Sequence, residues 1–337
     1  MPKQTKKTVP VEIQKKYALP SYLTDFQLEM FIHLIEWKWK HITKNKGKFR
    51  DKFYDTILPE SFQNEWHPVY QPLSNEIKKL GFKKHRHLGH MASSQAACLN
   101  LFYPLLRDER TANVVFPLIK PDFRELATDT LENGYAFEYC HESNPLNDHT
   151  PQAGTDADVA ISYFNTSGDL SLWLIEHKLT EDEFTRCGGY RTKMNINKHY
   201  CRDGKLILAD HDKCYYSYSC RYKYWEITKD SNLYSFQSRD SRTSCPFMGG
   251  ENQLWRNQLL GHSIRKLGPF KNAHFSVVHH PDNHDLDKTV NNYVSLLKDK
   301  SVFSCFTSRE VIEAAKKVES EEIKKWVSWY SDLYRIR

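Results

Sequence analysis

The chain has 337 residues, of which 39% are hydrophobic and 27% are charged, and its formal net charge is +6. It contains enough apolar residues for a packed core, but no apolar run long enough to span a bilayer, which excludes a membrane-embedded protein. The small basic excess permits a polyanionic partner without requiring one, and the length predicts one large domain or two modest ones.

The N-terminal third of the chain has mainly helical patterns. Residues 1–20 are basic and lack an apolar signal segment, so we expect a disordered tail and a cytoplasmic protein. Helices are predicted over 24–43, 73–80 and 91–106. We expect them to form a helical region over 21–112 that packs on the core.

From residue 113 to 337 the pattern changes to strands mixed with helices. After a predicted helix over 122–132, strand-like runs occupy 135–140, 158–164 and 170–178. The Ser-Gly-Asp sequence between the last two runs is typical of a turn, and it predicts a hairpin. One more strand (275–280) and four further helices are predicted, the helices at 251–266, 285–298, 308–318 and 320–335. This mixture predicts an α/β or α+β fold with a central mixed sheet flanked by helices.

Residues 185–250 form a cysteine-rich insert with little periodicity. A segment of this length is expected to need a cross-link or a bound metal to become ordered. Thiolates are suitable ligands for Zn²⁺ or an iron–sulfur cluster. Cys201, His199 and His211 are alternative ligands. The four cysteines that we expect to bind the metal are Cys187, Cys214, Cys220 and Cys245.

Two acids and a lysine lie on the predicted hairpin. Glu176 and Lys178 end the second strand and, because strand side chains alternate, share one face, with His177 on the other. Pairing about the turn places Asp158 opposite roughly Glu176. Two carboxylates can hold Mg²⁺ and leave room for water and phosphate, and a lysine beside them can orient the attacking water. Burial beside a metal is expected to lower the pKa of this lysine.

This stretch resembles the D…(D/E)xK core of restriction-endonuclease-like nucleases, the PD-(D/E)xK superfamily. Together with HRHLGHMASSQAACLNLFYPLL upstream, EHKLTEDEF at the lysine and CPFMGGENQLWRNQLLG downstream, it resembles a bacterial family of restriction-endonuclease-like proteins over about residues 85–262. The resemblance implies Mg²⁺-dependent (or Mn²⁺-dependent) cleavage of DNA. It also implies that Asp158 and Glu176 hold the metal and that Lys178 is the catalytic lysine.

The superfamily often has a further acidic residue near the first strand. Glu125 and Glu138 are the candidates, and we prefer Glu138 because an acid within the apolar run YAFEYC needs a partner or a function. Asp156 is an alternative to Asp158, but Asp158 directly precedes the apolar strand.

Nucleases of this superfamily with a RecB-like core place Gln and Tyr four residues apart on a following helix. This chain has Gln253, but Asn257 stands where the tyrosine would be, which argues against that subtype. Gln253 and Arg256 are predicted to contact nucleic-acid phosphate.

The leading interpretation is a DNA endonuclease acting in restriction or phage defence, with no membrane partner. A homodimer would allow it to cut both strands. The alternative is a nucleic-acid-binding protein with a degenerate nuclease core and a structural metal site. An RNA-directed nuclease is a third reading.

Overall fold

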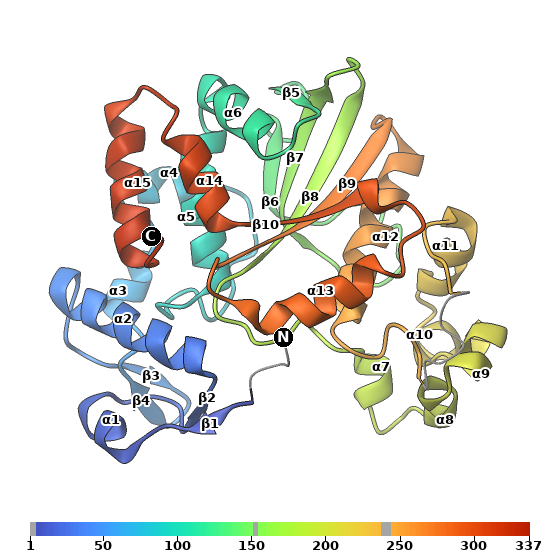
Figure 1. Ribbon diagram of the computed structural model, residues 1–337, viewed down its shortest axis with the longest axis horizontal. Coiled ribbons are helices and arrows are strands. Elements are labelled where there is room, and N and C mark those ends of the chain that lie inside the picture. The colour runs from blue at the N-terminus through green and yellow to red at the C-terminus, as the bar shows by residue number, and fades with distance from the viewer. Residues whose placement is uncertain (1–4, 151–153, 237–243) are drawn as a thin grey trace.

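A computed structural model describes residues 5–150, 154–236 and 244–337 of the chain. A twisted mixed sheet lies at the centre, and helices cover both of its faces (Figure 1). The α/β architecture with a helix-flanked mixed sheet is therefore confirmed. No helix in the described ranges has the length and apolar character that a membrane crossing requires.

Within the described residues, the central sheet has six strands. Their order is β10-β9-β8-β7-β5, and β6 also pairs with β7. The strands β5, β6 and β8 are antiparallel to β7, whereas β8, β9 and β10 run parallel. The strands are β5 (Phe123–Leu126), β6 (Tyr135–Tyr139), β7 (Ala157–Asn165), β8 (Leu170–Lys178), β9 (Asn272–His279) and β10 (Phe303–Thr307).

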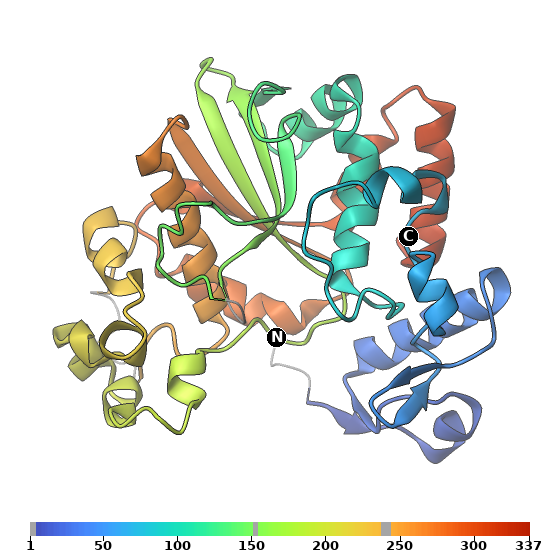
Figure 2. The same ribbon diagram turned by 180° about the vertical axis from the view of Figure 1, so that it is seen from behind.

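Side chains alternate along β7 and β8, so each strand contributes to two apolar cores. Val159 and Ile175 belong to the core that includes helix α5 (Ser94–Leu106). Ala160 and Leu174 belong to the core of the opposite face, which includes helix α12 (Glu251–Leu267). Figure 2 shows α5 and α12 on either side of the sheet. Residues at even positions in β8 therefore face α12.

The predicted hairpin of β7 and β8 is confirmed. Val159 pairs with Ile175, and continuing this register by one residue puts Asp158 opposite Glu176. The connecting turn is closed by the Asn165 N–H, which donates to the Asp169 carbonyl at 3.0 Å. Gly168 in this turn has φ +81°, a conformation that glycine adopts at little cost.

The expectation of a disordered tail over 1–20 is wrong for the described residues 5–20. Strand β1 (Lys7–Thr8) pairs with β2 (Tyr22–Leu23), and helix α1 (Val11–Lys16) follows β1. Tyr17 is buried and stacks on Trp39 of the next helix. The apolar residues of this segment therefore form a small core of their own with that helix.

The rest of the N-terminal region is less helical than predicted. Helix α2 (Asp25–His41) begins at Thr24, whose side chain and that of Gln27 form the two bonds of a capping box. The remaining elements are β3 (Gly47–Phe49), β4 (Lys52–Tyr54), α3 (Glu60–Asn64), α4 (Ser74–Ile77) and α6 (Glu109–Val115).

The helix predicted over 122–132 is wrong, because Phe123–Leu126 forms β5 and completes an edge of the sheet. Strand β10 was not predicted from the sequence. The helices of the C-terminal part are shorter than expected: α13 (Asp287–Val294), α14 (Ser308–Ala315) and α15 (Glu321–Leu333).

The cysteine-rich insert contains short helices: α7 (Gly188–Arg191), α8 (Lys198–Arg202), α9 (Gly204–Ala209), α10 (Tyr215–Tyr218) and α11 (Tyr224–Ser231). Its aromatic side chains pack against α12, as where Phe247 stacks on Trp255 with ring centroids 4.2 Å apart. The insert is thus ordered in part by an aromatic core that its lack of periodicity concealed. It lies on the opposite side of the molecule from the N-terminal region (Figure 1).

Candidate active site

Asp158, Glu176 and Lys178 come together at one end of the β7–β8 hairpin. The Nζ of Lys178 lies 2.9 Å from an oxygen of Glu176, and both side chains are almost fully buried. Asp158 is half-buried and accepts a hydrogen bond of 2.6 Å from the backbone N–H of His177. Strand alternation turns His177 to the other face, where Ser94 contacts its ring and its carbonyl.

Two amides of α12 hold the Glu176 carboxylate. The side-chain N–H groups of Gln253 and Asn257 donate to its two oxygens at 2.6 and 2.8 Å. Because the two residues are one helical turn apart, they lie on the same face of α12. The Gln253 oxygen also accepts from the Thr185 N–H at 2.9 Å, which fixes the orientation of its amide.

Glu138 is the third carboxyl group of the site. Its neighbours Phe137 and Tyr139 pair with residues 159 and 157 of β7, so Glu138 lies across from Asp158. Glu138 has φ +48°, which is unusual for a non-glycine residue in a strand and is typical of functional positions.

The other acidic candidates are placed elsewhere. Glu125 pairs with Phe164 at the opposite end of β7, and its side chain forms an ion pair with Arg124. Asp156 precedes β7 and bonds to His149. The structure thus brings Glu138, rather than Glu125, to the end of β7 that carries Asp158.

Crowding of negative charge changes how these acids titrate. Burial raises the pKa of Asp158 well above its ordinary value, and the charges of Glu176 and Glu138 raise it further. Burial likewise raises the pKa of Glu138 from 4.5 to about 7, with smaller contributions from the charges of Glu176 and Asp156. In both cases the charged carboxylate is disfavoured in a protein that lacks a compensating cation.

Lys178 does not behave as expected from its burial. Burial alone would lower its pKa, but the charges of three acids (Glu176, Glu181 and Asp158) raise the pKa above its ordinary value. Among the protein groups alone, the acids therefore outweigh desolvation, and the pKa lowering expected beside a metal stays a prediction. Lys178 remains a cation and a hydrogen-bond donor.

This donor set fits a hard divalent cation. Such ions bind carboxylate oxygens and retain several water ligands. Asp158 and Glu176 offer oxygens from opposite strands, and a divalent charge would relieve the repulsion that raises the pKa of Asp158. The residues at this end of the sheet are thus suited to Mg²⁺ or Mn²⁺.

Asn257 was not expected to take part in the site. In the sequence it stands out only because it occupies the position of the tyrosine in the RecB-like pattern. Its spacing of four residues from Gln253 was the available signal, since both must face the same way on a helix. Arg256 turns aside, and its guanidinium donates to the Thr155 hydroxyl at 3.3 Å and to the Gly154 carbonyl at 3.5 Å.

Four cysteines of the insert influence one another. The pKa of Cys245 is raised well above its ordinary value by burial and further by the charges of three other thiols, those of Cys214, Cys187 and Cys201. The backbone N–H of Cys245 donates to the Cys201 carbonyl at 2.8 Å. Cys220 interacts with Cys214. Cys201, an alternative ligand in the sequence analysis, is thus linked to Cys245 by this backbone bond and by its electrostatic influence.

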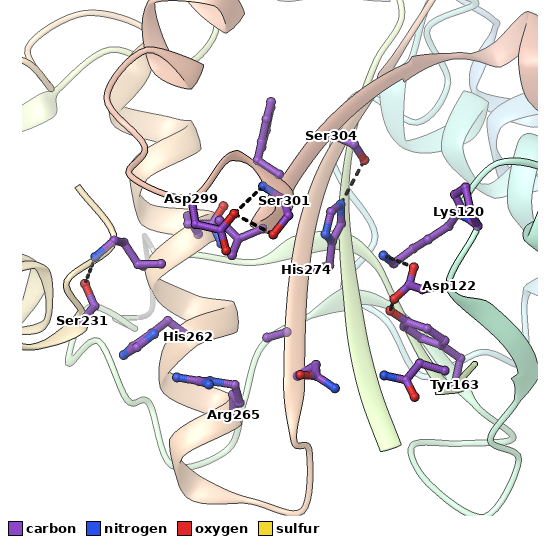
Figure 3. A pocket seen from close by; sticks show the side chains of 18 of the residues that line it. Lys120, Asp122, Tyr163, Ser231, His262, Arg265, His274, Asp299, Ser301 and Ser304 are labelled. Atoms are coloured by element: carbon purple, nitrogen blue, oxygen red, sulfur yellow. Dashed lines mark hydrogen bonds and ion pairs between the residues drawn. The ribbon is translucent and has the colours of Figure 1, made fainter. Parts of the chain in front are cut away.

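One large cavity lies away from the carboxylates. A cavity of about 760 Å³ lies at the other end of the sheet, where Lys120, Asp122, Tyr163 and His274 line it together with residues of α12 (Figure 3). A smaller cavity of about 370 Å³ reaches Glu138 and Cys140. We place the candidate active site at the carboxylates, because acid excess and a paired lysine indicate chemistry more directly than volume does.

The family described as restriction endonuclease associating with ARP matches residues 33–335. The chain belongs to this family. It is therefore restriction-endonuclease-like, and the match spans α2 to α15, so the carboxylate site and the cysteine-rich insert both lie within the family's domain. No curated protein and no solved structure matches the chain.

Proposed function

We propose that the chain is a metal-dependent endonuclease of the PD-(D/E)xK type that hydrolyses phosphodiester bonds of DNA. The observation that supports this most directly is the place of Asp158 and Glu176, each one residue beyond the Val159–Ile175 pair of the hairpin, with Lys178 2.9 Å from Glu176. The restriction-endonuclease family assignment points to the same chemistry.

Each side chain has a distinct role in the proposed reaction. Asp158 and Glu176 would hold Mg²⁺ or Mn²⁺, which supplies Lewis-acid stabilisation of the phosphate and acidifies a bound water. Gln253 and Asn257 fix the Glu176 carboxylate so that its oxygens keep one orientation. Such support of a ligand typically affects metal affinity by 10–100-fold.

Lys178 and Glu138 would act on the water and the phosphate. As a cation, Lys178 donates hydrogen bonds that orient the attacking water and stabilise the phosphate oxygens. Glu138, which lies across from Asp158, would act as general base and accept the proton as the water oxygen bonds to phosphorus. The bond from phosphorus to the leaving oxygen then breaks, and that oxygen takes a proton from solvent.

The proposed DNA contacts lie outside the carboxylate site. Five exposed cations on and around the β3–β4 hairpin offer phosphate contacts: Lys44, Lys46, Lys48, Arg50 and Lys52. We propose a role in restriction or phage defence, in company with the ARP that the family description names. A homodimer would allow both strands to be cut.

A cleavage assay tests the proposal. Purified protein is incubated with plasmid DNA in Mg²⁺, in Mn²⁺ and in EDTA, with an RNA substrate in parallel. We expect DNA cleavage with either metal, none in EDTA, and none from Asp158→Asn protein that still melts cooperatively. Cleavage that persists in Asp158→Asn would place the chemistry elsewhere, and cleavage of RNA alone would change the substrate class.

A second candidate function rests on the cysteines of the insert. The chain would then be a nucleic-acid-binding protein with an inactive core, ordered by Zn²⁺ or an iron–sulfur cluster on Cys187, Cys201, Cys214 and Cys245. Metal analysis and the visible absorption spectrum of anaerobically purified protein would identify the metal. DNA binding that needs this metal, without cleavage in Mg²⁺, would favour the second candidate over the first.

A further inference from the structure

The connection between β6 and β7 brings together three side chains that the proposed nuclease chemistry does not use. Cys140 directly follows β6, Asp156 directly precedes β7, and His149 lies between them in sequence. One ligand atom from each of the three lies within 4.8 Å of the other two. In the described part of the chain, this is the one group of His, Cys, Asp or Glu residues that meets that limit.

A buried acid orients the histidine of this group. The Nδ1 of His149 lies 3.4 Å from Asp148, whereas its Nε2 lies 2.7 Å from Asp156. Histidines that bind metals commonly donate one ring N–H to a carboxylate, which leaves the other nitrogen free for the ion. Asp148 lies at ion-pair distance on the Nδ1 side of His149, without a hydrogen bond from that nitrogen, and Nε2 faces Asp156.

The orienting acid is itself held firmly. Asp148 is 2% exposed, and its second oxygen accepts hydrogen bonds from the hydroxyls of Tyr224, at 2.6 Å, and Thr155. Gly154 lies against the imidazole, since a Cβ at that position would come within 2.6 Å of the His149 ring. The position of the ring is therefore set by tertiary packing from three segments of the chain.

We infer that Cys140, His149 and Asp156 form a binding site for Zn²⁺, separate from the carboxylate site. Thiolate, imidazole and carboxylate are the three ligand types that Zn²⁺ takes in proteins, whereas Mg²⁺ prefers oxygen alone. Three protein ligands leave one tetrahedral position for water. Binding displaces the Cys140 thiol proton and the proton between His149 and Asp156, so affinity falls as the pH is lowered.

Such a site would fasten the two ends of the connection to each other. Cys140 lies two residues after Glu138, and Asp156 lies two residues before Asp158. Zn²⁺ would thus hold together the strand ends that carry two of the proposed catalytic acids. The inference does not depend on nuclease activity, because the site is defined by its own ligands.

Protection of Cys140 from alkylation tests the site without an activity assay. The full chain, stripped of metal, is treated with N-ethylmaleimide without Zn²⁺ and with Zn²⁺ titrated to a several-fold excess, and labelling of each cysteine is followed by peptide mass spectrometry. We expect Zn²⁺ to slow labelling of the exposed Cys140 at least tenfold and Mg²⁺ to leave it unchanged. Because Zn²⁺ is in excess and each cysteine is read separately, metal binding by the cysteines of the insert does not interfere.

Three variants make the test specific. His149→Ala and Asp156→Asn are expected to abolish the protection, and His141→Ala is expected to retain it. His141 is a suitable control because it lies half-buried in the same connection and contacts Ser143. Thermal melting verifies that each variant is folded. Equal labelling of Cys140 with and without Zn²⁺, or protection that survives in His149→Ala, would overturn the inference.

Discussion

Two lysines at opposite ends of the central sheet are alike in burial and ion pairing, but their pKa values shift in opposite directions. Lys178 and Lys120 are each 8% exposed, and each has a carboxylate within ion-pair distance: Glu176 at 2.9 Å and Asp122 at 2.6 Å. Yet the pKa of Lys178 is raised, whereas burial lowers the pKa of Lys120 despite its partner.

The number of nearby acids explains the difference. The charges of Glu176, Glu181 and Asp158 raise the pKa of Lys178. Glu138 adds a further acid close to Asp158. Lys120 has Asp122, whose charge is also satisfied by the Tyr163 hydroxyl at 2.9 Å. One end of the sheet thus has an excess of acid that a divalent cation would neutralise, while the other is balanced. An ion pair alone does not indicate a metal site.

Replacing each lysine in turn should show the largest difference between the two ends of the sheet, one effect being on activity and the other on stability. We expect Lys178→Ala to reduce DNA cleavage by roughly 10²–10³-fold, since a charged donor to the reacting groups is lost. Lys120→Ala should leave cleavage nearly unchanged and lower the free energy of unfolding by about 1–2 kcal/mol, because Asp122 is partly solvated. Initial cleavage rates and urea unfolding measure both effects. Equal loss of activity in the two variants would contradict the comparison.

Added Mg²⁺ should stabilise only the end with excess acid. At about 100 times its dissociation constant, a ligand that binds the folded state raises the free energy of unfolding by about 2.7 kcal/mol. We expect this gain for the wild type and for Asp122→Asn, but not for Asp158→Asn. Thermal melting in EDTA and across a Mg²⁺ titration measures it. A gain that persists in Asp158→Asn would show that Mg²⁺ binds elsewhere.

The acid excess also predicts how stability depends on pH. Since the folded state raises the pKa of Glu138 from 4.5 to about 7, it binds this proton more tightly than the unfolded state does. Glu138 therefore destabilises the metal-free protein as the pH rises through this window, by an amount on the order of 3 kcal/mol. In EDTA, Glu138→Gln should lose less stability than the wild type between pH 4.5 and 8. Parallel curves for the two proteins in urea unfolding would contradict this.

The smallest effect is expected from the amides of α12. Asn257→Ala should weaken Mg²⁺ binding about tenfold, because it frees one oxygen of Glu176. Gln258→Ala is the matched control, since the neighbouring residue lines the cavity at the other end of the sheet. Isothermal titration of Mg²⁺ into both variants compares them. Similar affinities in the two would remove Asn257 from the site.

Much of the fold followed from local patterns, and the exceptions have physical causes. Strand alternation and a turn sequence were sufficient for the β7–β8 hairpin and its register. Residues 122–132 were mistaken for a helix because Phe123–Leu126 is ordered by pairing with β7, which no local pattern records. Strand β10 was missed for the same reason, since it is defined by its parallel partner β9.

The sequence by itself determined that Glu176 and Lys178 share a face and that Asp158 lies opposite them, because these relations depend only on strand period and hairpin register. Only the tertiary structure decided what surrounds them. It brings Gln253 and Asn257 of α12 against Glu176, and it places Glu138, which the sequence already favoured over Glu125, across from Asp158. These contacts join residues far apart in the chain, and the packing that sets them leaves no periodic signal in the sequence.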